Sequence, residues 1–170
     1  MKILGVLGSP RVGGNSDILL QQALAAGKEA GAEVEKIVLS KKKISGCLDC
    51  TKCNETGICV IKDDMPKIHK KILEADAIIH SVPLYFWAMT AQMKAYLDRW
   101  CAFFDANWEW HKAYAPRMKG KRIGLITVCG DADHAADRMN EYRKAGVTLP
   151  ILMPIGNVDY AVEALSPNRS

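Results

Sequence analysis

Short apolar runs of buried-strand type recur along this 170-residue chain, and segments with helical periodicity separate them. Strands that alternate with helices are typical of a parallel sheet with helices on both faces, joined by right-handed crossovers. Apolar runs of four to eight residues suit strands, whereas the longer periodic segments suit helices. We expect strands over residues 2–7, 33–39, 77–82, 122–128 and 149–155, and helices over 17–30, from 63 onward, 89–104 and 133–145.

Five strands in a chain of this length suit a flavodoxin-like α/β fold, a doubly wound five-stranded parallel sheet with strand order 2-1-3-4-5. Pro150 and Pro154 would confine the last strand to a sheet edge, because proline cannot donate to a central ladder. Residues 1–170 contain no recognisable linker or internal repeat, so we predict a single domain. In such sheets ligands bind beyond the carboxyl ends of the strands. We therefore expect the chemistry in the loops after strands one, three and four.

The first of these loops, residues 8–16, has the composition of a phosphate site. It lies between a buried strand and a helix N-terminus, where free backbone N–H groups and the helix dipole attract an anion. Ser9, Asn15 and Ser16 add short hydrogen-bond donors, and Gly14 stands where a Walker loop would need lysine. The loop therefore suits a terminal monophosphate such as that of FMN. The alternative is a turn that binds no ligand.

Aromatic residues fill the loop after the third strand. Tyr85, Phe86 and Trp87 follow one another there, at the edge where a ligand is expected. Such side chains suit a planar heteroaromatic ring, which they contact by stacking or edge-on packing. Anchoring the next helix, or a dimer contact, are the alternatives. Cys129 and Gly130, after the fourth strand, would complete the ring pocket with backbone N–H groups.

Four of the six cysteines form the pattern C-x2-C-x2-C-x5-C, made by Cys47, Cys50, Cys53 and Cys59. Three thiolates at three-residue steps can converge on one cluster, and the fourth can close the cage. The spacing resembles the cluster-binding run of bacterial ferredoxins and favours a 4Fe–4S cluster. A four-thiolate zinc site and metal-free thiols are the alternatives. The cysteines occupy a long loop, residues 44–62, inserted after the second strand.

The basic excess of the chain gathers around these cysteines. The net charge is +4, and residues 36–71 hold nine lysines against four acidic residues. A charge run is usually a solvated face, but these lysines also suit an anionic cluster and could dock an acidic carrier such as ferredoxin. The lysines are not arrayed with a nucleic-acid reading motif, so we predict no nucleic-acid partner. The apolar runs are too short for a membrane span or a signal peptide, so we predict no membrane partner and a cytoplasmic location.

Other reactive residue types receive no functional role. His80 lies inside an apolar strand and is expected to pack in the core. His69, His111 and His134 have no metal-ligand spacing. Cys101 is expected to be a small buried hydrophobe rather than a nucleophile.

The phosphate loop, the turn Pro83–Phe86 and the helix that begins at Thr90 together resemble the NADPH-dependent FMN reductase superfamily. The cysteine motif resembles that of its iron–sulfur flavoprotein branch. The resemblance covers roughly residues 1–130, and Trp87 and Ala88 depart from the glycine and small residue that relatives often have there. It implies that the FMN phosphate is bound by Ser9, Arg11, Asn15 and Ser16, with Gly14 beside them. It implies that the isoalloxazine ring is lined by Pro83, Leu84, Tyr85, Phe86, Trp87, Cys129 and Gly130.

The leading hypothesis is a redox flavoprotein that couples FMN to a 4Fe–4S cluster and passes electrons from NAD(P)H or a ferredoxin-like donor to an acceptor. The cofactors would carry the chemistry, so we assign no catalytic side chain. The alternative is an NAD(P)H-dependent FMN or quinone reductase whose cysteines bind zinc or no metal. A third hypothesis is a flavodoxin-like sensor or binding module. The aromatic run over residues 103–110 favours a homo-oligomer, either a dimer or a tetramer; closure of this segment over the flavin is the alternative.

Overall fold

The computed structural model describes residues 1–103 and 116–128. The helix expected over 133–145 and the fifth strand expected over 149–155 lie outside these residues. So do Cys129, Gly130, His111 and His134.

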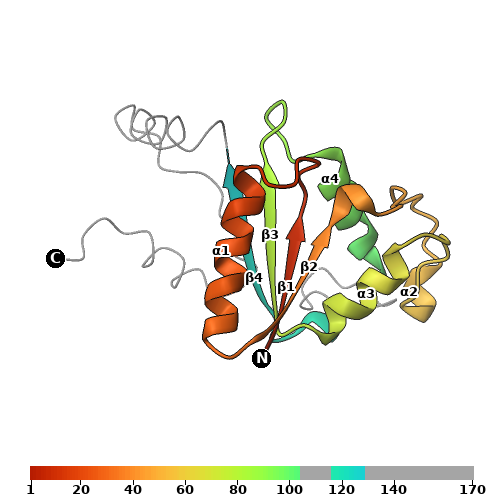
Figure 1. Cartoon of the computed structure of the whole chain (residues 1–170). Coiled ribbons are helices and arrows are strands. Elements are labelled where there is room, and N and C mark those ends of the chain that lie inside the picture. The colour runs from red at the N-terminus through yellow and green to blue at the C-terminus, as the bar shows by residue number, and fades with distance from the viewer. Residues whose placement is uncertain (104–115, 129–170) are drawn as a thin grey trace, which may run out of the picture.

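Four strands form one parallel sheet in the order β2-β1-β3-β4 (Figure 1). They are β1 (Lys2–Leu7), β2 (Glu33–Val38), β3 (Ala77–Pro83) and β4 (Arg122–Val128). The register places Leu4 of β1 opposite Ile78 of β3, and Ile78 opposite Ile123 of β4. The doubly wound parallel sheet predicted from the alternation of strands and helices is thus confirmed, with the order 2-1-3-4 for the four described strands.

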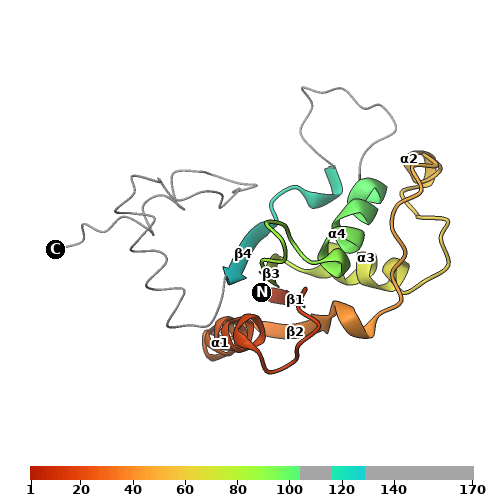
Figure 2. The same ribbon diagram turned by 90° about the horizontal axis from the view of Figure 1, so that it is seen from above.

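Helices cover both faces of this sheet. Figure 2 shows α1 (Asn15–Glu29) on one face, with α3 (Met65–Glu74) and α4 (Ala91–Asp98) on the other. The remaining elements are the short helix α2 (Cys53–Thr56) and the 3-10 turns η1 (Leu39–Lys41), η2 (Arg99–Phe103) and η3 (Pro116–Met118). The described part of the chain has no helix that is long and apolar enough to cross a membrane.

Two helix boundaries differ from the prediction. We expected Ser16 or Asp17 to cap α1, but the N-cap is Gly14, and the carboxylate of Asp17 bonds back to the N–H of Gly13 from inside the first turn. The helix expected over 89–104 begins later, because Thr90 caps it by accepting a hydrogen bond from the Met93 N–H. It then tightens into the 3-10 turn η2, as helix C-termini often do.

The core lies on both faces of the sheet, as buried strands require. Ile3 and Leu7 of β1 pack toward α1, whereas Leu4 and Val6 belong to the larger cluster beneath α3 and α4. His80 is 5% exposed, so its predicted place in the core is confirmed. Its Nε2 lies 3.2 Å from the hydroxyl of Tyr96 on α4, which ties the helix to the centre of β3.

Candidate functional site

The loop that leaves β1 is fixed by its neighbours at the carboxyl edge of the sheet. The N–H of Gly8 donates to the carbonyl of Ser81 on β3 at 2.7 Å, and the Thr90 hydroxyl donates to the Gly8 carbonyl at 2.7 Å. Ser81 also donates its hydroxyl to the carbonyl of Ser16, again at 2.7 Å. A side chain at Gly8 would meet Met93 at 2.9 Å and Val82 at 3.0 Å, so any larger residue here would force these neighbours to shift. The loop is therefore held rigidly before any ligand arrives.

A buried ion pair supports the same loop from the α1 side. The Asp17 carboxylate is fully buried, accepts the Gly13 N–H at 2.9 Å, and pairs with the Lys36 ammonium at 2.8 Å. Burial alone would raise the pKa of Asp17, but the hydrogen bonds from Lys36 and Gly13 outweigh it and lower that pKa below its usual range. Asp17 is therefore charged at neutral pH and holds the turn in place.

The residues expected around a phosphate lie together in this loop and the first turn of α1. Ser9 is 5% exposed, and its hydroxyl accepts the Arg11 N–H at 3.1 Å. Arg11 itself is exposed, whereas Ser16 is buried. Asn15 is the first residue of α1, directly after the N-cap Gly14. The N-terminus of a 15-residue helix thus faces a loop with an exposed cation, which is an arrangement that binds anions.

The aromatic loop after β3 forms a tight hairpin turn. Tyr85 and Ala88 exchange two backbone hydrogen bonds of 2.8 and 3.1 Å, and the two residues between them, Phe86 and Trp87, have φ values of +46° and +64°. Two consecutive positive φ angles define a type I′ turn, which normally takes Asn or Gly. Phe86 is 97% exposed and Trp87 is 84% exposed, and the turn projects beyond the carboxyl ends of the strands (Figure 1). Backbone strain and exposed aromatic surface coincide at this edge, which is typical of a binding site.

The phosphate loop and the aromatic turn lie on adjacent strands, because β1 pairs directly with β3 up to Leu7 and Ser81. Of the expected ring-lining residues, Pro83 ends β3, and Leu84 and Tyr85 are exposed after it. Sequence reasoning missed Asp17, Ser81 and Thr90 as supports of this edge. A threonine just before a helix is a capping signal, but partners on other strands leave no local pattern.

The cysteine loop lies beside α3 and α4, to one side of the sheet, with α2 at its outer end (Figure 2). Positive φ angles of 49° at Asp49 and 56° at Thr51 flank Cys50, and Gly57 ends α2 with a φ of 67°. The backbone therefore reverses direction repeatedly, as a loop must if it is to turn successive thiols toward one centre. The Asp49 N–H donates to the Sγ of Cys47 at 3.4 Å.

The four motif thiols are free and differ in their exposure to solvent. Cys53 is buried, Cys47 and Cys59 are half-buried, and Cys50 is exposed. Burial raises the pKa of Cys53, and the charges of Cys59, Cys47 and Cys50 raise it further. Within residues 1–103 and 116–128, no three His, Cys, Asp or Glu side chains are gathered closely enough to hold a metal ion. Four thiols on one loop nevertheless match a 4Fe–4S or a four-thiolate zinc site in the number and kind of donors.

Cys101 lies against this loop, a neighbour that no sequence pattern indicated. We predicted a small buried hydrophobe, and the structure differs in the degree of burial, since Cys101 is half-buried in η2. Burial raises its pKa, and the neighbouring Cys47 and Cys53 raise it further. Its position on another element, far from the motif in sequence, explains why spacing did not reveal it.

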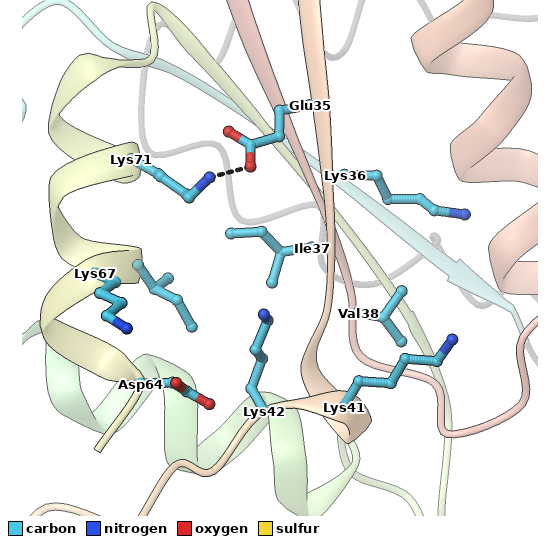
Figure 3. A pocket seen from close by; sticks show the side chains of 10 residues that line it. Glu35, Lys36, Ile37, Val38, Lys41, Lys42, Asp64, Lys67 and Lys71 are labelled. Atoms are coloured by element: carbon cyan, nitrogen blue, oxygen red, sulfur yellow. Dashed lines mark hydrogen bonds and ion pairs between the residues drawn. The ribbon is translucent and has the colours of Figure 1, made fainter.

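Lysines line a cavity of about 290 Å³ between β2, η1 and α3 (Figure 3). Two of these lysines are paired, Lys36 with Asp17 and Lys71 with Glu35. The others, Lys41, Lys42 and Lys67, are exposed and make no ion pair with a described residue. The basic excess predicted from the sequence therefore includes an open cationic cavity beside the base of the cysteine loop.

Comparison with known proteins gives consistent matches. The family model described as NADPH-dependent FMN reductase matches residues 1–164. An iron-sulfur flavoprotein of Archaeoglobus fulgidus is 37% identical over 159 residues, which cover 92% of this chain and 68% of that protein. An iron-sulfur flavoprotein of Methanocaldococcus jannaschii is 46% identical over 99 residues, 58% of this chain and 51% of its own length.

Among solved structures, a flavone reductase superposes with a TM-score of 0.57 at 31% identity, over 78% of this chain and 44% of that chain. The chain thus spans about half the length of the second relative and of this reductase. The predicted flavodoxin-like fold class is confirmed by these likenesses and by the parallel sheet.

Proposed function

Because this chain belongs to the NADPH-dependent FMN reductase family, we propose that it is an FMN-dependent oxidoreductase that also holds a 4Fe–4S cluster. The observation that carries the proposal is the pairing of two features in one chain. The carboxyl edge of the sheet has a fixed anion loop beside exposed aromatic rings, and a separate loop supplies four thiols.

The flavin would lie at the carboxyl edge. Ser9, Asn15 and Ser16, with backbone N–H groups around Gly14, would hold the phosphate, and the exposed guanidinium of Arg11 would neutralise it. The side chains from Pro83 to Trp87 would pack against the ring, and we expect Cys129 and Gly130 to complete its lining. The fixed loop favours binding, because little conformational entropy remains to be lost.

The cluster would be held by Cys47, Cys50, Cys53 and Cys59. When both groups are bound, FMN supplies two-electron and one-electron chemistry and the cluster supplies one-electron transfer. The protein's part is to bind both groups and to fix their surroundings. The N–H group that donates to the Cys47 sulfur is the kind of contact that tunes a cluster potential.

The electron donor would be NAD(P)H or an acidic ferredoxin-like carrier. The open cationic cavity around Lys41, Lys42 and Lys67 supports the acidic carrier, because complementary charge accelerates the association of two proteins. Exposed apolar residues on the cysteine loop, Leu48, Ile58 and Val60, support a homo-oligomer that covers them. The oligomeric state can be measured by light scattering.

Purification without oxygen, followed by analysis of iron, sulfide, zinc and flavin, tests the proposal. We expect bound FMN together with equal amounts of iron and sulfide. Cys50→Ala should abolish the broad visible absorption of the cluster and leave FMN bound, and the matched control Cys101→Ser should retain both. A cluster spectrum that survives Cys50→Ala would contradict the assignment of this ligand.

The alternative is an NAD(P)H-dependent FMN or quinone reductase whose cysteines bind zinc or nothing. The four free thiols also match a four-thiolate zinc site in the number and kind of donors. Stoichiometric zinc without sulfide, with steady turnover of NAD(P)H and a quinone, would support this alternative.

A further inference from the structure

Arg99, at the start of η2, is the largest of the fully buried side chains among the described residues and is 1% exposed. Its guanidinium makes a two-pronged contact with Asp63, with Nη1 at 2.6 Å from Oδ2 and Nη2 at 3.2 Å from Oδ1. Nη1 also donates to the carbonyl of Ser45 at 2.9 Å. One buried cation therefore binds two residues that stand before and after the cysteines in sequence.

The two ends of the cysteine segment are also bonded directly to each other. The Ser45 N–H donates to Asp63 at 3.0 Å, and the Lys43 N–H donates to the Asp64 carboxylate at 2.8 Å. The Asp64 N–H returns a bond to the Lys43 carbonyl at 2.9 Å. We call the set Lys43, Ser45, Asp63, Asp64 and Arg99 the clasp. It closes the loop at its base without using any cysteine.

The clasp also places charge beside the thiols. Burial would lower the pKa of Arg99, but the hydrogen bond with Asp63 and the neighbouring Cys59 raise it. Burial would raise the pKa of Asp63, and the bonds from Arg99 and from two backbone N–H groups lower it. Both groups are therefore charged at neutral pH. The guanidinium is therefore a buried cation that contacts Asp63 and interacts with the Cys59 thiol.

We propose that Arg99 is a positioning residue for the cysteine loop, with two roles. Its first role is to hold the loop closed before metal arrives. Its second role is to offset the negative charge of the thiolates once the metal is bound. The first half concerns the loop alone. The second half rests on the proposed function, because it requires a cluster. Charge-assisted, two-pronged bonds suit this task, since they fix direction as well as distance.

Hydrogen exchange on the full-length chain carrying Cys50→Ala tests the first half without a cluster. We expect the amides of Ser45 and Asp64 to be protected, and Arg99→Met to remove that protection while the amides of β1 stay protected. Free exchange at Ser45 and Asp64 with Arg99 present, or a chain that is unfolded without the cluster, would overturn this half.

Chelator challenge and redox titration of the iron-loaded protein test the second half. Arg99→Lys keeps the charge but loses the two-pronged contact, so we expect cluster loss to become about tenfold faster, as for other outer contacts of metal sites. Arg99→Met should in addition shift the cluster's midpoint potential to a more negative value, because reduction adds charge that the guanidinium offsets. The matched control is Lys94→Met, which removes an exposed cation from α4, close in sequence to Arg99.

These outcomes separate the two proposals. If the wild-type protein contains no iron and sulfide, both the cluster assignment and the charge-offsetting role of Arg99 are wrong. The hydrogen-exchange result then decides whether Arg99 holds the loop closed. A cluster that has the same loss rate and the same potential in the Arg99 variants as in Lys94→Met defeats the role of Arg99 alone. If Arg99→Met does not fold, the Arg99→Lys loss rate decides.

Discussion

Gly8 is the residue on which the geometry of the carboxyl edge depends most directly. A Cβ there would meet Met93 at 2.9 Å and Val82 at 3.0 Å. Gly8→Ala should lower the free energy of unfolding by about 1–3 kcal/mol, because an overpacked contact forces neighbours to move. It should also weaken FMN binding, since the same loop would carry the phosphate.

Urea denaturation and flavin titration check this. Gly124→Ala in β4 is the control, because its nearest neighbour would be Ile79 at an ordinary 4.0 Å. Equal stability of the two alanine variants would contradict the argument.

Two buried histidines make stability depend on pH. Burial lowers the pKa of His80 and of His69 from 6.5 to about 4. The unfolded chain therefore takes up protons first as the pH falls. The stability that these groups provide is complete above pH 6.5 and is lost as the pH falls toward 4. Each histidine should contribute a slope of about 1.4 kcal/mol per pH unit in that window.

Denaturation of the purified protein across this pH window measures the slope. His80→Gln can still reach the Tyr96 hydroxyl but does not titrate, so it should remove about half of the slope, and His69→Gln should remove the other half. A slope that neither variant changes would show that other groups are responsible.

At the residue scale, the sequence predicted which loop carries short donors but not what holds the loop. The short donors lie in a strand–glycine–helix pattern, which can be recognised within one stretch of sequence; they are Ser9, Asn15 and Ser16. The supports from Ser81 and Thr90 come from elements more than 60 residues away, with separations of 65 and 82 positions. Arg99 and Asp63 are 36 positions apart and follow no periodicity. Such pairs arise only when the sheet has formed.

At the element scale, the aromatic turn is strained, because Phe86 and Trp87 occupy positive-φ positions that normally take Asn or Gly. Trp87 has a φ of +64°, where a non-glycine residue costs about 1–2 kcal/mol. Trp87→Gly should therefore raise the free energy of unfolding by about 1 kcal/mol. It should also weaken FMN binding roughly two- to tenfold, through the loss of one aromatic contact.

The result that supports this argument is a Trp87→Gly protein that is more stable than the wild type but binds FMN more weakly. Ala88→Gly, at the next position and with an ordinary φ, should lower stability slightly and leave the rings in place. A Trp87→Gly protein that binds FMN normally would remove this turn from the proposed site.

Elements with strong local patterns were predicted well. All four described strands lie within a residue of their expected bounds. Short apolar runs predicted β1, β3 and β4, because buried strands need apolar sequence, whereas an imperfect alternation of apolar residues predicted β2. The start of α3 was also clear from Asp64 and Pro66. The expected helix after the aromatic loop was too long. Its apolar stripe continues through η2, but the α-helix ends at Asp98 and η2 is a 3-10 turn. The spacing of apolar residues indicates which face is buried, but it does not distinguish an α-helix from a 3-10 turn.

At the scale of the whole molecule, charge is distributed unevenly. The net charge is +4, and three lysines that have no ion pair with any described residue gather at the cavity between β2 and α3. Reduction by an acidic protein carrier should therefore slow as salt rises toward 0.15 M, where the screening length falls to about 8 Å. Reversing the charge at Lys41, Lys42 and Lys67 should flatten this dependence.

Stopped-flow reduction at several ionic strengths provides the measurement, with NADPH as the reference donor. The variant with three reversed charges should use NADPH as well as the wild type does, because none of these three lysines has a described ion pair or hydrogen bond with the phosphate loop. Salt-independent reduction of the wild type by the carrier would exclude steering by these lysines.

The clasp has a consequence for how chains of this kind can diverge. Because residues 43–45 bond directly to residues 63–64, the two ends of the insert are held together whatever the length of the chain between them. Extra length in a closed loop adds little entropic penalty. Descendants of one ancestor could therefore exchange, shorten or strip this insert, and so gain or abandon a metal centre, while inheriting the same nucleotide-binding scaffold intact.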